Sequence, residues 1–327
     1  MSKEGSGQEE HDSYDITTDP MFSDVTPIYS SEKEMAVVNI AVPAREASIF
    51  AYFRAIISSN EISERGLQLS YKCIELNAAN YTVWKYRRDC IKSLNKDLRK
   101  ELEVMYDIFI TNTKNYQVWR HRMEIISHLN DCTGELKYLD EIYEIDNKNY
   151  HAWQYRIWLV KEFNLCDEDQ IIFTNLMLSS DLRNNSVWHY RNFVVSTIYG
   201  NNQDYSLIER EIKFVKDAIT RVVNNESAWS YLFGLLGMAK PEDVLMVYNF
   251  ARDTAKEKKR SKIQANVFLM DLFTEMDSKD QLRELLNDEF KVAVQETSSE
   301  LVACDEQRGQ YWEDLGKLLI ANFDKCT

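Results

Sequence analysis

Apolar residues recur in the middle of the chain at the spacing of one helix face. Steps of three, four and three residues place one set on a common face: Trp84, Arg87, Ile91 and Leu94. The same steps start again at four later tryptophans: Trp119, Trp153, Trp188 and Trp229. Such spacing is typical of the buried stripe of an amphipathic helix. The sequence therefore predicts a series of related helices.

The tryptophans at positions 84, 119, 153, 188 and 229 follow one another at intervals of 35, 34, 35 and 41 residues. Each follows an asparagine by four positions, and asparagine is a preferred helix N-cap because its side chain accepts a bond from a free amide of the first turn. A second helical stretch precedes them, such as DLRKELEVMYDIFI from Asp97 and GELKYLDEIYEI from Gly134. We expect helical hairpins at 62–95, 97–130, 133–165, 167–200 and 207–240.

Neither helix of such a hairpin can bury its stripe alone, so neighbouring repeats must stack. The predicted fold class is all-α, an α-solenoid superhelix of helical hairpins. Nine Gly and four Pro are too few for a turn-rich β protein or a glycine-looped nucleotide fold. The arginine on the buried stripe must meet carboxylates or carbonyls, because an unpaired buried charge is costly. We expect it to pin neighbouring repeats together.

The two ends of the chain lack the repeat. Residues 1–34 carry two Lys against nine Asp or Glu and predict an acidic, disordered tail. We expect residues 35–327 to form one superhelical domain, which IFAYFRAII from Ile49 enters as a helix. Three further amphipathic runs would cap the solenoid: NVFLMDLF from Asn266, QLRELLNDEF from Gln281 and YWEDLGKLLI from Tyr311.

Charge and cysteine usage exclude several classes. A net charge of −14 disfavours nucleic-acid binding, which needs clustered Lys and Arg, and would attract basic partners. The basic run 252–262 is interpreted as a solvated face. Six cysteines without CxxC or Cys/His spacing predict neither a zinc site nor a disulfide framework. No signal peptide or long apolar run is found, so we expect a cytoplasmic protein without membrane insertion.

The NYxxW-x-[YH]-R unit resembles the repeat of protein prenyltransferase alpha subunits. The resemblance covers roughly residues 35–325 and is tightest over four segments: NAANYTVWKYRR at 77–88, KNYQVWRHR at 114–122, KNYHAWQYR at 148–156 and RNNSVWHYR at 183–191. Within the family these segments look like the subunit shared by the farnesyl and type I geranylgeranyl enzymes. Tetratricopeptide repeats share the period but place their tryptophan in a different context, which is absent here.

This resemblance implies a heterodimer in which a crescent of hairpins wraps around a barrel-shaped beta subunit. The pair would transfer a farnesyl or geranylgeranyl group from a prenyl diphosphate to the cysteine of C-terminal CaaX proteins such as small GTPases. The catalytic zinc would belong to the beta subunit, and any Mg²⁺ would accompany the diphosphate. This chain alone would bind no cofactor and would be inactive without its partner.

The resemblance also implies site residues. Carried over by position, the catalytic set is Lys114, Tyr116 and His151. The substrate-binding set is Gln117, which would meet the CaaX carboxylate, with Tyr81 and Asn115 along the peptide groove. Negative charge builds on the departing diphosphate, and an ammonium, a phenol and an imidazole are suitable partners for it. Helix amino-terminal ends also favour anions.

Other interpretations stay open. From the residues alone, Lys114 would be a solvated loop lysine, Tyr116 a packing tyrosine, and His151 a surface or inter-repeat histidine. The chain as a whole would then be a non-enzymatic solenoid adaptor that binds peptides or partner proteins. An alpha subunit of a Rab-type geranylgeranyltransferase is a further alternative. The convergence of the three candidate side chains on one edge favours the enzyme, and the identity of the partner separates the two enzyme classes.

Overall fold

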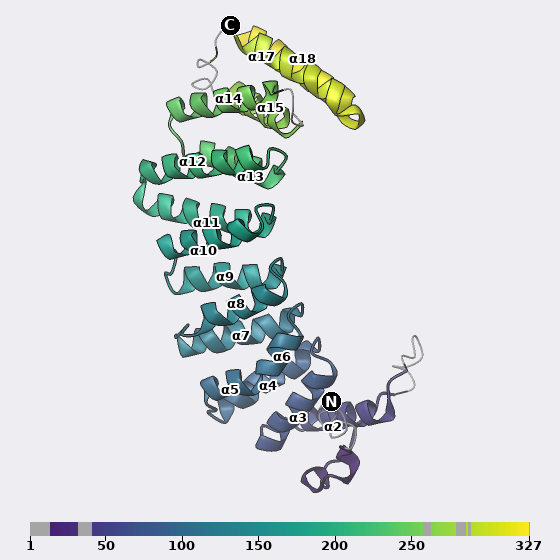
Figure 1. Cartoon of the computed structure of the whole chain (residues 1–327). Coiled ribbons are helices and arrows are strands. Elements are labelled where there is room, and N and C mark those ends of the chain that lie inside the picture. The colour runs from purple at the N-terminus through teal and green to yellow at the C-terminus, as the bar shows by residue number, and fades with distance from the viewer. Residues whose placement is uncertain (1–13, 32–40, 258–262, 279–285, 287–288, 327) are drawn as a thin grey trace, which may run out of the picture. The chain divides into compact units, whose positions relative to one another are not determined.

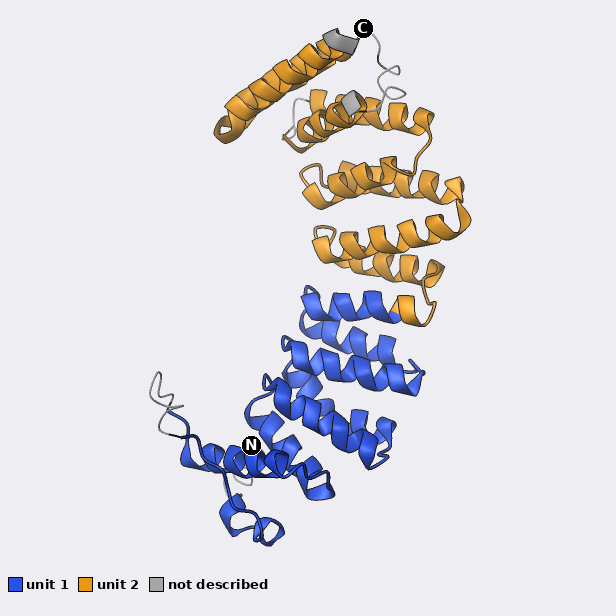
Figure 2. Ribbon diagram, turned by 180° about the vertical axis from the view of Figure 1, so that it is seen from behind, with its two compact units in different colours: residues 1–159 blue, residues 160–327 orange. Residues whose placement is uncertain are grey.

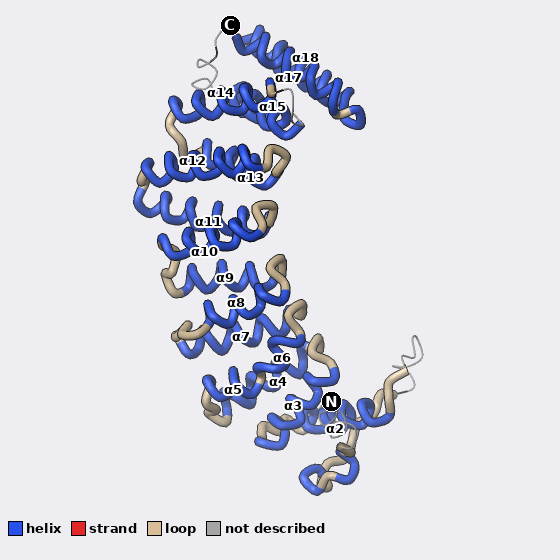
Figure 3. Tube along the Cα trace, in the orientation of Figure 1, coloured by secondary structure: helices blue, strands red, loops and turns tan. Residues whose placement is uncertain are grey.

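The computed structural model describes residues 14–31, 41–257, 263–278, 286 and 289–326. Within these ranges every regular element is a helix, as Figure 3 shows, so the chain has the predicted all-α solenoid fold class. The chain divides into two compact units, residues 1–159 and 160–327, which Figure 2 colours separately. Whether residues 35–327 behave as one domain stays a prediction. None of the described helices is both long and apolar enough to traverse a lipid bilayer.

Unit 1 begins with two short 3-10 helices and continues with helices packed as successive layers (Figure 1). In chain order its elements are η1 (Ile16–Thr18), η2 (Pro20–Phe22), α2 (Ala44–Ser58), α3 (Glu64–Leu76), α4 (Tyr81–Ser93), α5 (Leu98–Val104), α6 (Tyr106–Thr111), α7 (Tyr116–Leu129), α8 (Glu135–Ile145) and most of α9 (Tyr150–Glu162).

Unit 2 consists of longer helices and ends in a hairpin. Its elements are α10 (Glu168–Ser180), α11 (Asn185–Asn202), α12 (Tyr205–Arg221), α13 (Glu226–Leu236), α14 (Pro241–Lys256), α15 (Ile263–Ser278), α17 (Glu289–Cys304), η3 (Glu306–Arg308) and α18 (Gly309–Cys326). The helices pack in antiparallel pairs, among them α10 with α11, α12 with α13, α14 with α15 and α17 with α18.

The predicted helices outside the repeats are confirmed where the structure describes them. The Ile49 run lies in α2, the Asn266 run in α15 and the Tyr311 run in α18. The Gln281 run lies mostly outside the described residues. The run from Asp97 is split at Met105 into α5 and α6 instead of forming one helix. The basic run is helical in α14 through Lys256, and residues 258–262 are not described.

The repeat tryptophans are buried, and each indole N–H is satisfied locally. Each donates to the backbone carbonyl six residues earlier: Trp84 to Ala78 at 2.8 Å, Trp119 to Thr113 at 2.7 Å, Trp153 to Asn147 at 3.0 Å, Trp188 to Leu182 at 2.8 Å and Trp229 to Val223 at 2.7 Å. A buried indole needs such an acceptor. The bond therefore fixes the loop that enters each second helix against the core.

Asparagines begin and end the second helices. Four side chains accept the predicted cap bond from the amide two residues later: Asn80 at 3.2 Å, Asn115 at 2.9 Å, Asn149 at 2.9 Å and Asn184 at 3.0 Å. The predicted bond is absent at Asn225, whose side-chain amide instead donates to the Leu182 carbonyl at 2.7 Å. After the helices, left-handed backbone occurs at Asn60, Asn95, Asn130 and Asn164. Asparagine tolerates this conformation, which ends a helix.

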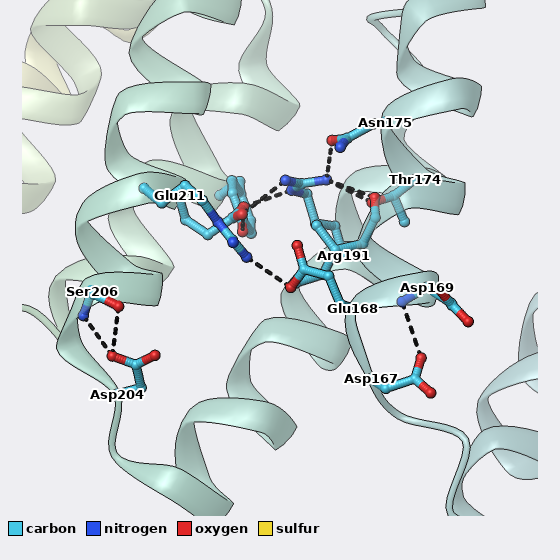
Figure 4. Close-up of polar contacts among 12 residues, drawn as sticks. Asp167, Glu168, Asp169, Thr174, Asn175, Arg191, Asp204, Ser206 and Glu211 are labelled. Atoms are coloured by element: carbon cyan, nitrogen blue, oxygen red, sulfur yellow. Dashed lines mark hydrogen bonds and ion pairs between the residues drawn. The ribbon is translucent and has the colours of Figure 1, made fainter.

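The stripe arginines meet carboxylates, as predicted. Three form buried two-point ion pairs with a glutamate of the next repeat: Arg87 with Glu101 at 2.7 Å, Arg122 with Glu135 at 2.8 Å and Arg191 with Glu211 at 2.6 and 2.8 Å. Arg156 lies 3.8 Å from the Asp140 carboxylate. Figure 4 shows Arg191 between Glu211 and the polar side chains of Thr174 and Asn175 on α10.

A second donor, from the same repeat as the glutamate, bonds each of these three carboxylates. The bonds are His121 to Glu101 at 2.8 Å, Tyr155 to Glu135 at 2.6 Å and Tyr231 to Glu211 at 2.7 Å. Each of these donors lies two residues after a repeat tryptophan. A buried carboxylate thus joins the arginine of one repeat to a tyrosine or histidine of the following one, which keeps the charge satisfied without water.

The expected disordered tail does not extend over residues 14–31. Ile16 and Phe22 are buried, and the Phe22 ring contacts Tyr52 of α2 edge-on, with centroids 6.0 Å apart. The Asp24 carboxylate accepts from Arg65 at 2.6 and 3.1 Å. These contacts cover the first layers of unit 1. Residues 1–13 and 32–34 lie outside the described residues.

Candidate functional site

The candidate site is built on the loops that open α7 and α9. These loops, residues 112–115 and 146–149, precede second helices of consecutive repeats in unit 1. They are bonded to each other, since the Asn149 side-chain amide donates to the Thr113 carbonyl at 3.0 Å. The same carbonyl accepts the Trp119 indole. Core packing therefore fixes the backbone on which the candidate residues stand.

Two of the three predicted catalytic side chains, Tyr116 and His151, are in contact at this edge, and Lys114 stands on the same pair of loops. The Tyr116 and His151 rings meet edge to face, with centroids 4.3 Å apart and planes at 87°. The His151 ring also hydrogen-bonds the backbone of Lys114. Lys114 and Tyr116 are exposed, by 78% for the lysine side chain and 69% for the tyrosine, and His151 is half-buried. An exposed, grouped set is available to a ligand in a way that packing residues are not.

The His151 imidazole binds a proton less readily than an ordinary histidine does. Partial burial lowers the pKa of His151 below its usual value, and the hydrogen bond to the Lys114 backbone opposes that shift without reversing it. The ring is further enclosed by Tyr150, whose ring centroid lies 5.7 Å away. The local positive charge therefore comes from the Lys114 ammonium and from the free amides of the α7 and α9 amino-terminal ends.

This arrangement can hold an anion with oxygen acceptors. The ammonium supplies a point charge, the phenol an O–H donor and the imidazole a ring nitrogen, all beside two helix amino-terminal ends. Stabilising negative charge that grows on such a ligand during a reaction needs donors fixed in advance. The interlocked loops meet that requirement.

The predicted substrate-binding residues are less closely grouped. Asn115 caps α7, and Gln117 stands half-buried in the first turn of the same helix. Tyr81 opens α4, one repeat earlier, and its ring is 71% exposed. No ring contact or hydrogen bond among the described residues joins Tyr81 to the other candidates. Its assignment to the peptide groove stays a prediction.

Sequence reasoning missed Asp146. Its carboxylate lies 3.3 Å from the Lys114 ammonium, and it follows the last turn of α8. The position seven residues before each tryptophan is occupied by Asn77, Asn112, Asp146, Asp181 and Val222. The aligned repeats show that the residue at this position varies. They do not show that Asp146 contacts Lys114 of the preceding repeat.

Among the described residues, no three His, Cys, Asp or Glu side chains come close enough to hold a metal ion. Nothing in the cluster resembles a ligand set, since Lys114 and Tyr116 are donors and Asp146 already faces the lysine.

Compared with known protein families, the chain matches one repeat model at five successive segments. The protein prenyltransferase alpha subunit repeat matches residues 63–94, 98–129, 132–163, 167–198 and 208–239. Each matched segment contains one repeat tryptophan. Lys114, Tyr116 and Gln117 fall in the second segment and His151 in the third.

Two relatives match along nearly their whole length. The chain is 39% identical over 292 residues to "Protein farnesyltransferase/geranylgeranyltransferase type-1 subunit alpha" of Dictyostelium discoideum, covering 86% of this chain and 90% of that one. It is 38% identical to the protein of the same name from Pisum sativum, with coverages of 93% and 95%. A solved structure, "Candida albicans protein geranylgeranyltransferase-I complexed with GGPP", contains a chain that matches with a TM-score of 0.76 and 27% identity, over 94% of this chain and 99% of that one.

Proposed function

Because this chain belongs to the protein prenyltransferase alpha-subunit family, we propose that it is the alpha subunit of a heterodimeric protein farnesyltransferase and type I geranylgeranyltransferase. The enzyme transfers a farnesyl or geranylgeranyl group from its diphosphate to the cysteine of a C-terminal CaaX sequence. This subunit supports the beta subunit and supplies groups that stabilise the leaving diphosphate. The type-1 names of the relatives that match over most of their length favour this over a Rab-type enzyme.

The observation that carries the proposal is the grouping of Lys114, Tyr116 and His151 on bonded loops. In the reaction a C–S bond forms between the cysteine sulfur and the first prenyl carbon while the C–O bond to the diphosphate breaks. The bonding electrons leave with the diphosphate. Its negative charge rises in the transition state, where the ammonium, the phenol and the ring nitrogen act most strongly.

The partner completes the site. We place the catalytic zinc, most of the isoprenoid pocket and the choice of prenyl length in the beta subunit, and any Mg²⁺ with the diphosphate. CaaX proteins such as small GTPases are the proposed acceptors, with Gln117, Tyr81 and Asn115 along the peptide groove. We place the activity in the cytoplasm.

Co-expression tests the assembly. We expect this chain to co-purify with a farnesyltransferase or type I geranylgeranyltransferase beta subunit, and the pair to prenylate a CaaX peptide with the matching diphosphate. The chain alone should be inactive. Stable binding to a Rab-type beta subunit instead, or no binding to any of the three, would contradict the proposal and support the Rab-type or adaptor alternative respectively.

A Lys114→Ala variant of the active heterodimer tests the site. We expect the single-turnover rate constant to fall by about one to two orders of magnitude, because a group aimed at developing charge acts on the chemical step. The affinity for prenyl diphosphate should change less. Lys148→Ala, at the same position of the next repeat, is the matched control. A wild-type single-turnover rate for Lys114→Ala would remove the lysine from the mechanism.

A further inference from the structure

Lys114 has one acidic neighbour in the described part of the chain. The ammonium lies 3.3 Å from the Asp146 Oδ2 atom, and no other ion pair of the described residues involves Lys114. Both side chains stand on the bonded loops that carry Tyr116 and His151. The acid therefore lies inside the cluster proposed to receive an anion, where a negative charge would oppose binding.

The local fold does not need this charge. The other carboxylate oxygen, Oδ1, accepts from the Lys148 amide at 3.0 Å and shapes the loop. At the same repeat position the neutral Asn77 makes the corresponding bond to the Ala79 amide at 3.1 Å. An amide oxygen thus suffices for the turn, and only the second oxygen of Asp146 distinguishes it. That oxygen faces Lys114.

We propose that Asp146 is a positioning residue that holds the Lys114 ammonium beside Tyr116 and His151, an inference that rests on the proposed function. A lysine on an exposed loop has many rotamers, and an ion pair restricts them. The aspartate also restrains the ammonium from binding the diphosphate fully before the reaction. The ion pair between Asp146 and Lys114 gives way only as negative charge grows on the leaving diphosphate. The lysine therefore binds the diphosphate more strongly in the transition state than in the ground state.

Asp146→Asn is a close test because it keeps the loop-shaping oxygen and the side-chain volume. In the heterodimer we expect the single-turnover rate constant to fall about three- to tenfold. The Kd for prenyl diphosphate should stay equal or become lower, because the site has lost a negative charge. An exposed ion pair adds little stability, so the melting temperature should match that of wild type.

Two further variants identify the route of action. Asp181→Asn alters the same repeat position one hairpin later, where the side chain accepts from the Arg183 amide at 2.9 Å, and it should leave both constants at wild-type values. In a Lys114→Ala background, Asp146→Asn should have no further effect, because the aspartate acts through the lysine.

The outcomes separate this inference from the proposed function. A slow Lys114→Ala enzyme together with wild-type rate in Asp146→Asn would overturn the positioning role and leave the function standing. A weaker Kd in Asp146→Asn, or an equal loss of rate with and without Lys114, would also overturn it, since either points to loop structure. A wild-type rate in Lys114→Ala would instead show that the lysine has no part in the proposed reaction, and the positioning role of Asp146 would fall with it.

Discussion

At the scale of single residues, His121 departs from the repeat. It occupies the position that tyrosine holds in the other repeats, and its Nε2 bonds Glu101 where Tyr155 bonds Glu135. Its ring is fully buried against Trp84, with centroids 4.9 Å apart. The sequence could place this histidine on a helix but not in an ion-pair junction, because its partner Glu101 lies in the first helix of the same hairpin, 20 residues earlier, and the Arg87 that joins them lies in the preceding repeat.

Histidine in place of tyrosine at position 121 makes the free energy of unfolding depend on pH, which a tyrosine there would not do near neutral pH. Burial lowers the pKa of His121, and the neighbouring Glu101 only partly opposes it. The unfolded chain takes up the proton near pH 6.5 and the folded chain only at lower pH. Between these values the unfolded state binds more protons, so the free energy of unfolding falls as pH falls.

We therefore expect His121→Gln to flatten the pH dependence of stability just below pH 6.5. Glutamine keeps an N–H donor for Glu101 but does not titrate. Urea unfolding of the full chain at several pH values measures the slope. His128→Gln, on the exposed side of the same helix, is the control for removing a histidine from α7. An unchanged slope in His121→Gln would show that the histidine does not titrate between the two states.

At the scale of elements, buried carboxylates join three helices at a time. Glu211 of α12 receives Arg191 of α11 and Tyr231 of α13 (Figure 4 shows the arginine side). The sequence predicted that stripe arginines would be paired but not with which residue. The glutamate lies 14, 13 or 20 positions after its arginine, because α11 is longer than α4 and α7 and the glutamates stand at different positions within their helices. Only the folded helices bring these partners into register.

Replacing Arg191 alone should lower the local stability more than replacing Arg191 and Glu211 together. Arg191→Met leaves a buried carboxylate with Tyr231 alone, and we expect a loss of about 3–5 kcal/mol of local stability. Adding Glu211→Gln should recover part of it, because an amide can accept from the tyrosine, as Gln170 does from Tyr190 at 2.8 Å. Hydrogen exchange of α11 to α13 in the heterodimer measures both. Equal protection in the single and double variants would contradict this account.

At the scale of the whole molecule, the repeats and the later helices were predictable and the amino-terminal segment was not. Five tryptophans at intervals of 34 to 41 residues, each four positions after an asparagine, indicated the hairpins, because each repeat supports the others. The amino-terminal segment offered no such comparison, and its acidic composition suggested disorder. Composition averages over a segment, whereas Ile16 and Phe22 bury individually. At the other end, α17 and α18 approach so closely that a Cβ on Gly316 would lie 2.6 Å from the Ser298 hydroxyl.

The amino-terminal segment should contribute to stability as a cap on unit 1. Phe22→Ala removes a buried ring from the surface of α2, and we expect it to cost about 3–5 kcal/mol. The adjacent Met21 is exposed, so Met21→Ala should change stability by less than about 0.5 kcal/mol. Urea unfolding measures the pair. Equal, small effects would mean that residues 14–31 do not hold unit 1 together.

The carbonyl of Thr113 receives both an indole and the amide of the next cap, and the Leu182 carbonyl in unit 2 receives the same pair from Trp188 and Asn225. The same arrangement of a loop carbonyl, an indole and a cap asparagine thus occurs once in each unit. The arrangement in unit 1 carries Lys114, Tyr116 and His151. The equivalent positions of the arrangement in unit 2 are occupied by Arg183, Asn185 and Ser227. The candidate site therefore differs from the arrangement in unit 2 in the side chains that it carries and not in the backbone that supports them.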